Sequence, residues 1–85
     1  MKDLIELLEY LDRNVPCLNG KKPIISLGLG RAIDIPYITI EARWFSDKEY
    51  KMEQAYSYQT ATQTPALAIA EVFTSACVMF LQYHS

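Results

Sequence analysis

The chain has 85 residues, 51% of them hydrophobic, and a formal net charge of −2 at pH 7, which is the composition of one ordinary globular domain covering 1–85. This balance excludes a disordered chain, and it lacks the basic excess typical of nucleic-acid-binding proteins. All eight Lys and Arg residues precede position 52, so the last third of the chain is nearly uncharged.

The residues that most often hold metals or cofactors are few. Cys17 and Cys77 have neither the Cys-x-x-Cys nor the Cys/His spacing of a zinc site, and His84 stands near the end of the sequence. The N-terminal segment is too acidic and amphipathic for a signal peptide. We therefore expect reduced thiols, a solvated His84, no metal and no cofactor.

The first 60 residues predict one helix and three strands. Apolar residues spaced three and four apart predict an amphipathic helix over 2–14, which Pro16 ends. A strand is predicted over 23–29, followed by a loop over 30–34. The clearest strand covers 34–45, where buried-type residues alternate with polar ones, and a third covers 50–60 with Tyr56 and Tyr58 in the core. Short connections between the strands predict an antiparallel meander.

A long apolar helix closes the sequence. Thr64 is a suitable N-cap, and Pro65 is favoured at a first helical position, so the helix is predicted from there toward Gln82. The predicted fold class is therefore α+β: a two-layer sandwich of order α-β-β-β-α, with a three-stranded antiparallel sheet packed against two helices. Polar residues interrupt the last helix and no basic residues flank it, so we expect no membrane span.

The last helix has more apolar surface than one small core can cover. One stripe, which includes Phe73 and Cys77, is predicted to face the sheet. A second stripe contains Val72, Met79 and Tyr83 and needs another cover, because large apolar patches on soluble proteins usually mark interaction sites. A second copy of the chain is the simplest cover, so we expect a homodimer formed through these residues.

Other candidate sites lie on the sheet and its loops. Arg31, at the tip of a glycine-containing loop, is a candidate anion contact, although neither a Walker nor a Rossmann fingerprint is present. Tyr37, Glu41 and Arg43 are expected on the open sheet face as a candidate protein-recognition surface. We expect Glu41 and Arg43 to form ion pairs with the neighbouring strand rather than an acid and base pair, and we therefore predict no enzyme.

The element order is also that of the double-stranded-RNA-binding domain. Such domains place a cluster of lysines at the start of the last helix, where the helix N-terminus also favours anions. Residues 62–67 contain no basic residue. The sequence therefore argues against a nucleic-acid partner.

The segment Ala-Thr-Gln-Thr-Pro-Ala-Leu-Ala-Ile-Ala at 61–70 resembles the entry into the C-terminal helix of the phage ABA sandwich domain family. The resemblance covers the last third of the chain and the order of elements. It implies a small phage or prophage protein that acts without catalysis in the cytoplasm of the host cell, and it supplies no site residues.

The leading functional expectation is protein–protein binding, including counter-defence by blocking a host immune complex. The alternative is a protein that binds or sequesters a small nucleotide-like ligand, in a pocket formed between two copies near Arg31 and the tyrosines.

Overall fold

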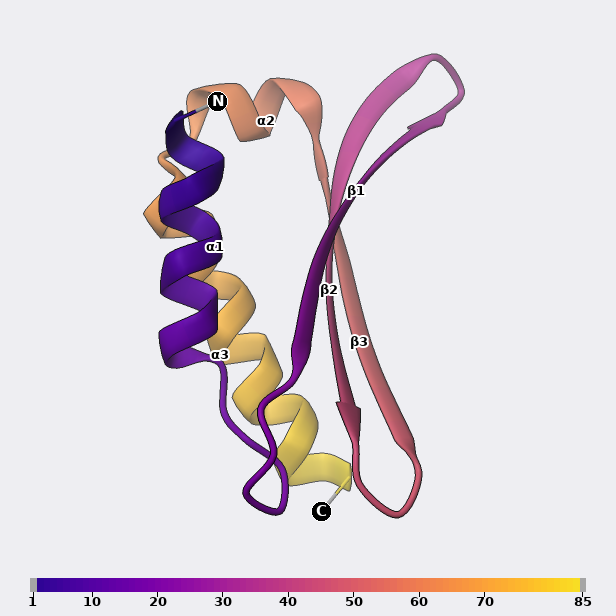
Figure 1. Ribbon diagram of the computed structural model, residues 1–85. Helices are drawn as coiled ribbons and strands as arrows, with labels where there is room; N and C mark the ends of the chain where they lie inside the picture. Colours follow the sequence, from indigo (N-terminus) through magenta and orange to yellow (C-terminus); the bar gives the residue numbers. More distant parts are fainter. Residues whose placement is uncertain (1, 85) are drawn as a thin grey trace.

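The structure is a computed structural model that describes residues 2–84, and it confirms the α+β class: three antiparallel strands form an open sheet with helices packed on one face (Figure 1). One element was not predicted, a short helix between the last strand and the long C-terminal helix. The elements are α1 (Lys2–Asn14), β1 (Ile24–Ala32), β2 (Ile35–Phe45), β3 (Glu49–Ser57), α2 (Tyr58–Gln63) and α3 (Ala66–His84).

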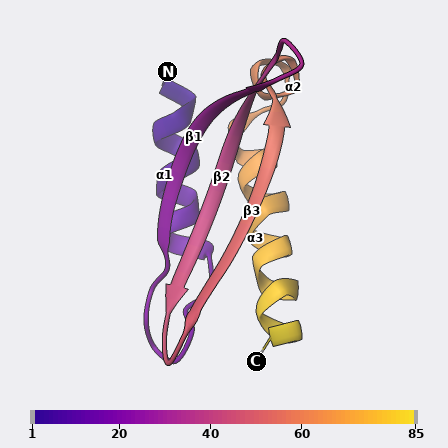
Figure 2. The same ribbon diagram turned by 90° about the vertical axis from the view of Figure 1, so that its right-hand side faces the viewer.

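The strands lie in the order β1-β2-β3, with β2 in the centre (Figure 2). Side chains alternate strictly along β2, as the sequence pattern predicts for a sheet covered on one side. Ile38, Ile40, Ala42 and Trp44 are buried under the helices, and the residues between them face outward.

The two long helices lie side by side behind the sheet, and α1 packs mainly against α3 rather than against the strands. Of the buried residues that the two long helices bring to the core, α3 supplies five, and α1 with the residue that follows it supplies three. The buried residues from these helices are Leu7, Leu11, Val15, Ile69, Ala70, Phe73, Cys77 and Leu81.

Trp44 joins the end of β2 to α3 and to the segment that follows α1. Its indole N–H donates a hydrogen bond to the carbonyl oxygen of Pro16 at 2.8 Å, and its ring stacks on Phe80 with centroids 5.9 Å apart. A buried Trp needs such a partner for its N–H. This end of the sheet is therefore fixed by both packing and hydrogen bonding.

The loop predicted over 30–34 is wrong, because β1 continues to Ala32 and only Ile33 and Asp34 form the turn into β2. The glycines that suggested a loop have a different role. A Cβ atom at Gly30 would collide with the ring of Tyr37, which is its partner across the strands, and a Cβ atom at Gly28 would lie 2.7 Å from Thr39 Oγ1. The two glycines therefore leave room for the Thr39 and Tyr37 side chains, which would have to move to admit a larger residue.

The strand predicted as far as residue 60 ends instead at Ser57. The Ser57 hydroxyl accepts a hydrogen bond from the backbone N–H of Thr60 at 3.2 Å and so caps α2. Tyr58 consequently lies on α2 and is exposed, so its predicted place in the core is wrong, whereas Tyr56 is half-buried against the core. Thr64 ends α2, and α3 begins directly after Pro65.

Candidate interaction surfaces

The first surface is a projecting hairpin, here called the arm and defined as residues 29–36. Tyr37 is the first residue of β2 that pairs with β3, so strand pairing within the arm is between β1 and β2 alone. The base of the arm, at Ile35 and Pro36, also lies beside Ser57 and Tyr58. Leu29, Ile33 and Ile35 are 84%, 95% and 59% exposed. Figure 1 shows the arm extending away from the helices, at the upper right of the view.

The turn at the tip of the arm has an unusual composition. Ile33 and Asp34 both have positive φ, 47° and 64°. Two-residue hairpin turns of this kind favour Asn, Asp and Gly. A β-branched residue in the left-handed region costs about 1–2 kcal/mol. The tip therefore carries an isoleucine where the backbone geometry disfavours one and where its side chain gains no cover from the described residues.

Arg31 lies on the arm and not in a loop, so the predicted anion-binding loop does not form. It pairs with Pro36, whereas Tyr37 pairs with Gly30. Because side chains alternate along a strand, Arg31 and Tyr37 point to opposite sheet faces, and the structure does not bring them together. Within the described residues Arg31 and Asp34 form no ion pair.

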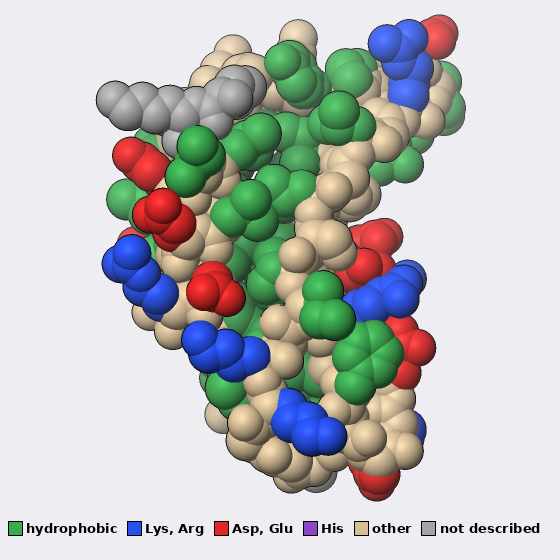
Figure 3. All heavy atoms as spheres, in the orientation of Figure 1, with side chains coloured by type: hydrophobic (Ala, Val, Ile, Leu, Met, Phe, Trp, Pro, Cys, Tyr) green, Lys and Arg blue, Asp and Glu red, His purple; other side chains and the backbone are tan. Residues whose placement is uncertain are grey.

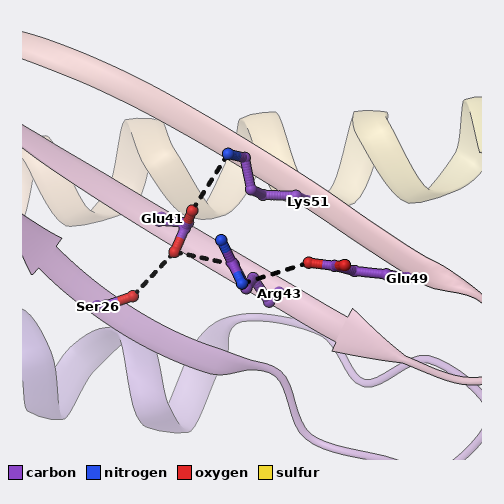
Figure 4. Close-up of polar contacts among 5 residues, drawn as sticks. All are labelled: Ser26, Glu41, Arg43, Glu49 and Lys51. Carbon is purple, nitrogen blue, oxygen red and sulfur yellow. Dashed lines mark hydrogen bonds and ion pairs between the residues drawn. The ribbon is translucent and has the colours of Figure 1, made fainter.

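The second surface is the open sheet face, where the predicted residues Glu41 and Arg43 form a charged network (Figure 4). A Glu41 carboxylate oxygen accepts a hydrogen bond from the Ser26 hydroxyl at 3.1 Å, and the other oxygen lies 3.5 Å from Lys51 Nζ. Arg43 contacts Glu41 through Nε at 3.1 Å and Glu49 through Nη1 at 3.4 Å. The Glu41–Lys51 and Arg43–Glu49 contacts are cross-strand ion pairs, as the sequence predicts, whereas the Glu41–Arg43 pair lies within β2.

The geometry of this network is that of a structural contact. The Arg43 Nε atom is buried, and its contact with Glu41 is an ion pair that lacks the alignment of a hydrogen bond. Burial raises the pKa of Glu41, but the Ser26 hydrogen bond and the charges of Arg43 and Lys51 lower it by more, so the pKa lies below its ordinary value. A carboxylate held ionised in this way is a poor proton donor.

The third surface, here called the α3 face, consists of Val72, Ala76, Met79 and Tyr83. The spacing of four, three and four residues places these side chains on one stripe of the helix. Val72, Met79 and Tyr83 are each more than half exposed, as predicted, and Ala76 is half-buried. By length and composition α3 could also cross a membrane, but the core helix of a soluble protein passes the same test, and five residues of α3 are buried in this fold.

A small apolar cavity of about 20 Å³, with room for about one water molecule, lies between the sheet and the first turns of the helices. It belongs to the upper half of the molecule in Figure 3, where apolar side chains are visible between α1 and the sheet edge. The lining residues are apolar apart from one tyrosine hydroxyl: Leu4, Leu7, Leu27, Ile38, Ile40, Tyr56, Ala61, Ala66 and Ile69.

The remaining reactive groups are structural. Burial raises the pKa of Cys77 to about 12, and the thiol donates to Met52 Sδ at 3.4 Å, so it stays protonated and is a poor nucleophile. Burial, followed by the neighbouring Cys77, also raises the pKa of Tyr56. His84 is exposed as predicted, but its ring also packs on Phe80 at 4.5 Å. Among residues 2–84 no cluster of three or more His, Cys, Asp or Glu side chains could hold a metal ion.

Comparison with protein-family models, curated proteins and solved structures finds no match for this chain. The resemblance to the phage ABA sandwich domain family therefore stays a prediction. The surface that sequence reasoning missed is the arm. The sequence does contain a pattern that indicates it, because apolar residues lie on both sides of the two-residue Ile-Asp turn. The glycines in β1 instead favoured the interpretation of that segment as a loop.

Proposed function

We propose that this protein is a small non-enzymatic binding protein that acts by protein–protein contact through its arm. The observation that carries this proposal is Ile33, an apolar side chain that is 95% exposed on a backbone conformation that β-branched residues disfavour. Residues held in costly conformations cluster at functional sites, and exposed apolar patches mark interaction surfaces. An isoleucine at this tip is explained if it enters an apolar cleft of a partner.

The charges on the arm fit the same kind of contact. Arg31 and Asp34 flank the apolar tip, and neither has an ion pair within the described residues. Protein interfaces commonly combine an apolar centre with a polar rim, and Arg is enriched in them. We infer that the partner has an apolar cleft whose rim offers one acidic and one basic group.

A non-enzymatic role is supported by the surroundings of the three groups whose pKa is shifted. Glu41 is held ionised within an ion-pair network, and burial keeps the Cys77 thiol and the Tyr56 hydroxyl protonated. Acid and base catalysis requires groups whose pKa values are tuned near the working pH beside a substrate site. These three groups have local structural explanations instead.

The resemblance to small phage proteins extends the proposal to a partner and a place. In this extended proposal, the protein comes from a phage or prophage, acts in the cytoplasm of the host cell, and blocks a host immune complex.

The test places a photo-crosslinking residue at position 33 or, as a control, at Lys48 in the exposed β2–β3 turn, and irradiates each protein in host lysate. We expect a specific adduct from position 33 only. Excess unlabelled wild-type protein should abolish the adduct, whereas the Ile33→Asn variant should not compete. Equal adducts from both positions, or full competition by Ile33→Asn, would refute binding through the arm.

The second candidate, a nucleotide-like ligand, rests on the unpaired Arg31 guanidinium. A ligand at ~100 times its Kd stabilises a protein by ~2.7 kcal/mol, which a thermal-shift panel of nucleotides would detect. The apolar cavity behind the sheet is too small to hold a nucleotide, so such a ligand would have to bind outside it. A panel without any shift would remove this candidate.

A further inference from the structure

We propose that the α3 face is a self-association surface, through which two copies pair their α3 helices in antiparallel orientation. This inference rests on α3 and is independent of the arm. Its starting point is that three large apolar side chains of the face, Val72, Met79 and Tyr83, are exposed although the same helix supplies five buried core residues.

The position of the face on the helix leaves it accessible. Leu67 lines a surface hollow together with Tyr10 and Asn14 of α1, so Leu67 marks the flank of α3 that lies beside α1. At 3.6 residues per turn, Val72 and Met79 fall on the opposite flank. Figure 2 shows that α3 lies behind β3, at the far edge of the sheet from α1. A second helix can therefore approach this flank without meeting α1.

The charges of α3 favour a second copy over another partner. Between Ala66 and His84 the helix has one acidic residue, Glu71, and no Lys or Arg. A strongly charged partner would find no counter-charge on this helix. A second copy presents an equally uncharged face, so two copies meet without the like-charge repulsion that discriminates against wrong partners.

The side-chain sizes on the face are also complementary to themselves. A two-fold axis between positions 76 and 79 places Ala76 opposite the partner's Met79 and Val72 opposite the partner's Tyr83. Each pair sets a smaller side chain against a larger one, and this alternation lets facing layers interdigitate. The spacing of four, three and four residues is that of a helix–helix seam in a coiled coil. A self-complementary patch of this kind closes into a symmetric dimer.

A membrane is the competing occupant, because α3 passes the length and composition test for a span. Insertion would require Phe73 and Cys77, both fully buried, to leave the core of the fold. A second copy covers the exposed stripe and leaves the core intact. The contact between two α3 faces involves four side chains from each copy, which is few compared with the ~800 Å² per partner of a standard interface. We therefore expect a dimer that dissociates on dilution.

Sedimentation equilibrium over a concentration series reaching high micromolar tests the proposal with wild type, Met79→Glu and Val78→Glu. Val78 is a matched control, because it lies on the same helix but off the stripe and is less exposed than Met79. We expect a dimer for wild type and Val78→Glu. Met79→Glu should weaken dimerisation by more than ~100-fold, since each copy would bury an unpaired carboxylate.

Three results would overturn the proposal. The first is a wild-type protein that remains monomeric at every concentration. The second is equal weakening by both variants while each keeps the wild-type urea midpoint. The third is co-sedimentation of monomeric wild type with phosphatidylcholine vesicles, which would make α3 a lipid-binding surface. Ile33→Asn should still dimerise, so failure of the arm proposal and failure of this one give different results.

Discussion

At one end of the sheet, Trp44 is fully buried, stacked on Phe80 and hydrogen-bonded to Pro16, while at the other end Leu29 on the arm is 84% exposed. Leu29 pairs with Ile38 across the strands, so it lies on the same sheet face as Ile38 and Trp44. The difference comes from what lies behind the sheet: helices cover the Trp44 end, whereas the arm extends beyond the helices into solvent (Figure 1). An apolar strand pattern therefore specifies a face, but the neighbouring elements decide whether that face is buried.

The largest expected effect is on the free energy of unfolding, which substitutions at the two ends should change by very different amounts. Trp44→Ala should lower the free energy of unfolding by about 3–5 kcal/mol, because it removes a buried aromatic ring and leaves a cavity. Leu29→Ala on the arm should change it by less than about 0.5 kcal/mol, as surface substitutions do. Urea unfolding of both variants measures the contrast.

Labelling of Cys77 gives an independent readout of the same contrast. Its thiol is buried and should react only when the core opens, whereas the exposed Cys17 should react at once in every variant. A loss of about 3 kcal/mol corresponds to labelling about 100-fold faster for Trp44→Ala. Similar Cys77 labelling rates in the two variants would contradict the assignment of the buried and free ends.

A smaller effect of opposite sign is expected at the tip of the arm. Ile33→Asn should raise the free energy of unfolding by about 1 kcal/mol, because Asn tolerates positive φ and Ile does not. For a domain of this size that corresponds to a melting temperature roughly 4–8 °C higher. The matched control is Ile35→Asn, which makes the same chemical change at a regular strand position and should give no gain. A lower melting temperature for Ile33→Asn would mean that the tip is not strained.

The smallest effect concerns the sheet face between the two ends. The pKa of Glu41 is lowered in the folded protein, so its ion pairs add stability above the ordinary value of 4.5, and this stability is lost as the pH falls through the lowered pKa. Glu41→Gln should therefore be slightly less stable than wild type near neutral pH. The difference should disappear in acid and shrink in salt. Urea midpoints measured against pH test this, and a difference that grows in acid would reverse the assigned sign.

The regular parts of the fold were predictable because their signals are local. The alternation around Ile38 and Trp44 and the helical spacing around Phe73 each identify an element and its buried face. The α3 face was predictable for the same reason, since Val72 and Met79 share one stripe. The recognition surface expected from Tyr37, Glu41 and Arg43 did fall on the open sheet face, although part of it is a structural ion-pair network.

The features that the sequence did not predict depend on contacts between elements. Gly28 and Gly30 weaken a strand in isolation, and only the cross-strand positions of Thr39 and Tyr37 explain why β1 contains them. Ser57 looks like an ordinary strand residue until its hydroxyl caps α2. The arm was missed because a β-branched residue at its turn contradicts turn preferences, and such conflicts between local preference and structure often mark function.

The packing of α1 against α3 has a consequence for synthesis of the chain. α1 is made first, yet it docks mainly on the last helix rather than on the strands that follow it. While the ribosome is still translating α3, the three strands can pair as two consecutive hairpins, but Leu7 and Leu11 have no Phe73 or Cys77 to pack against. The apolar stripe of α1 therefore stays largely uncovered until α3 emerges, and folding of the core is delayed to that moment. Apolar surface that is exposed in this way during folding is prone to aggregation.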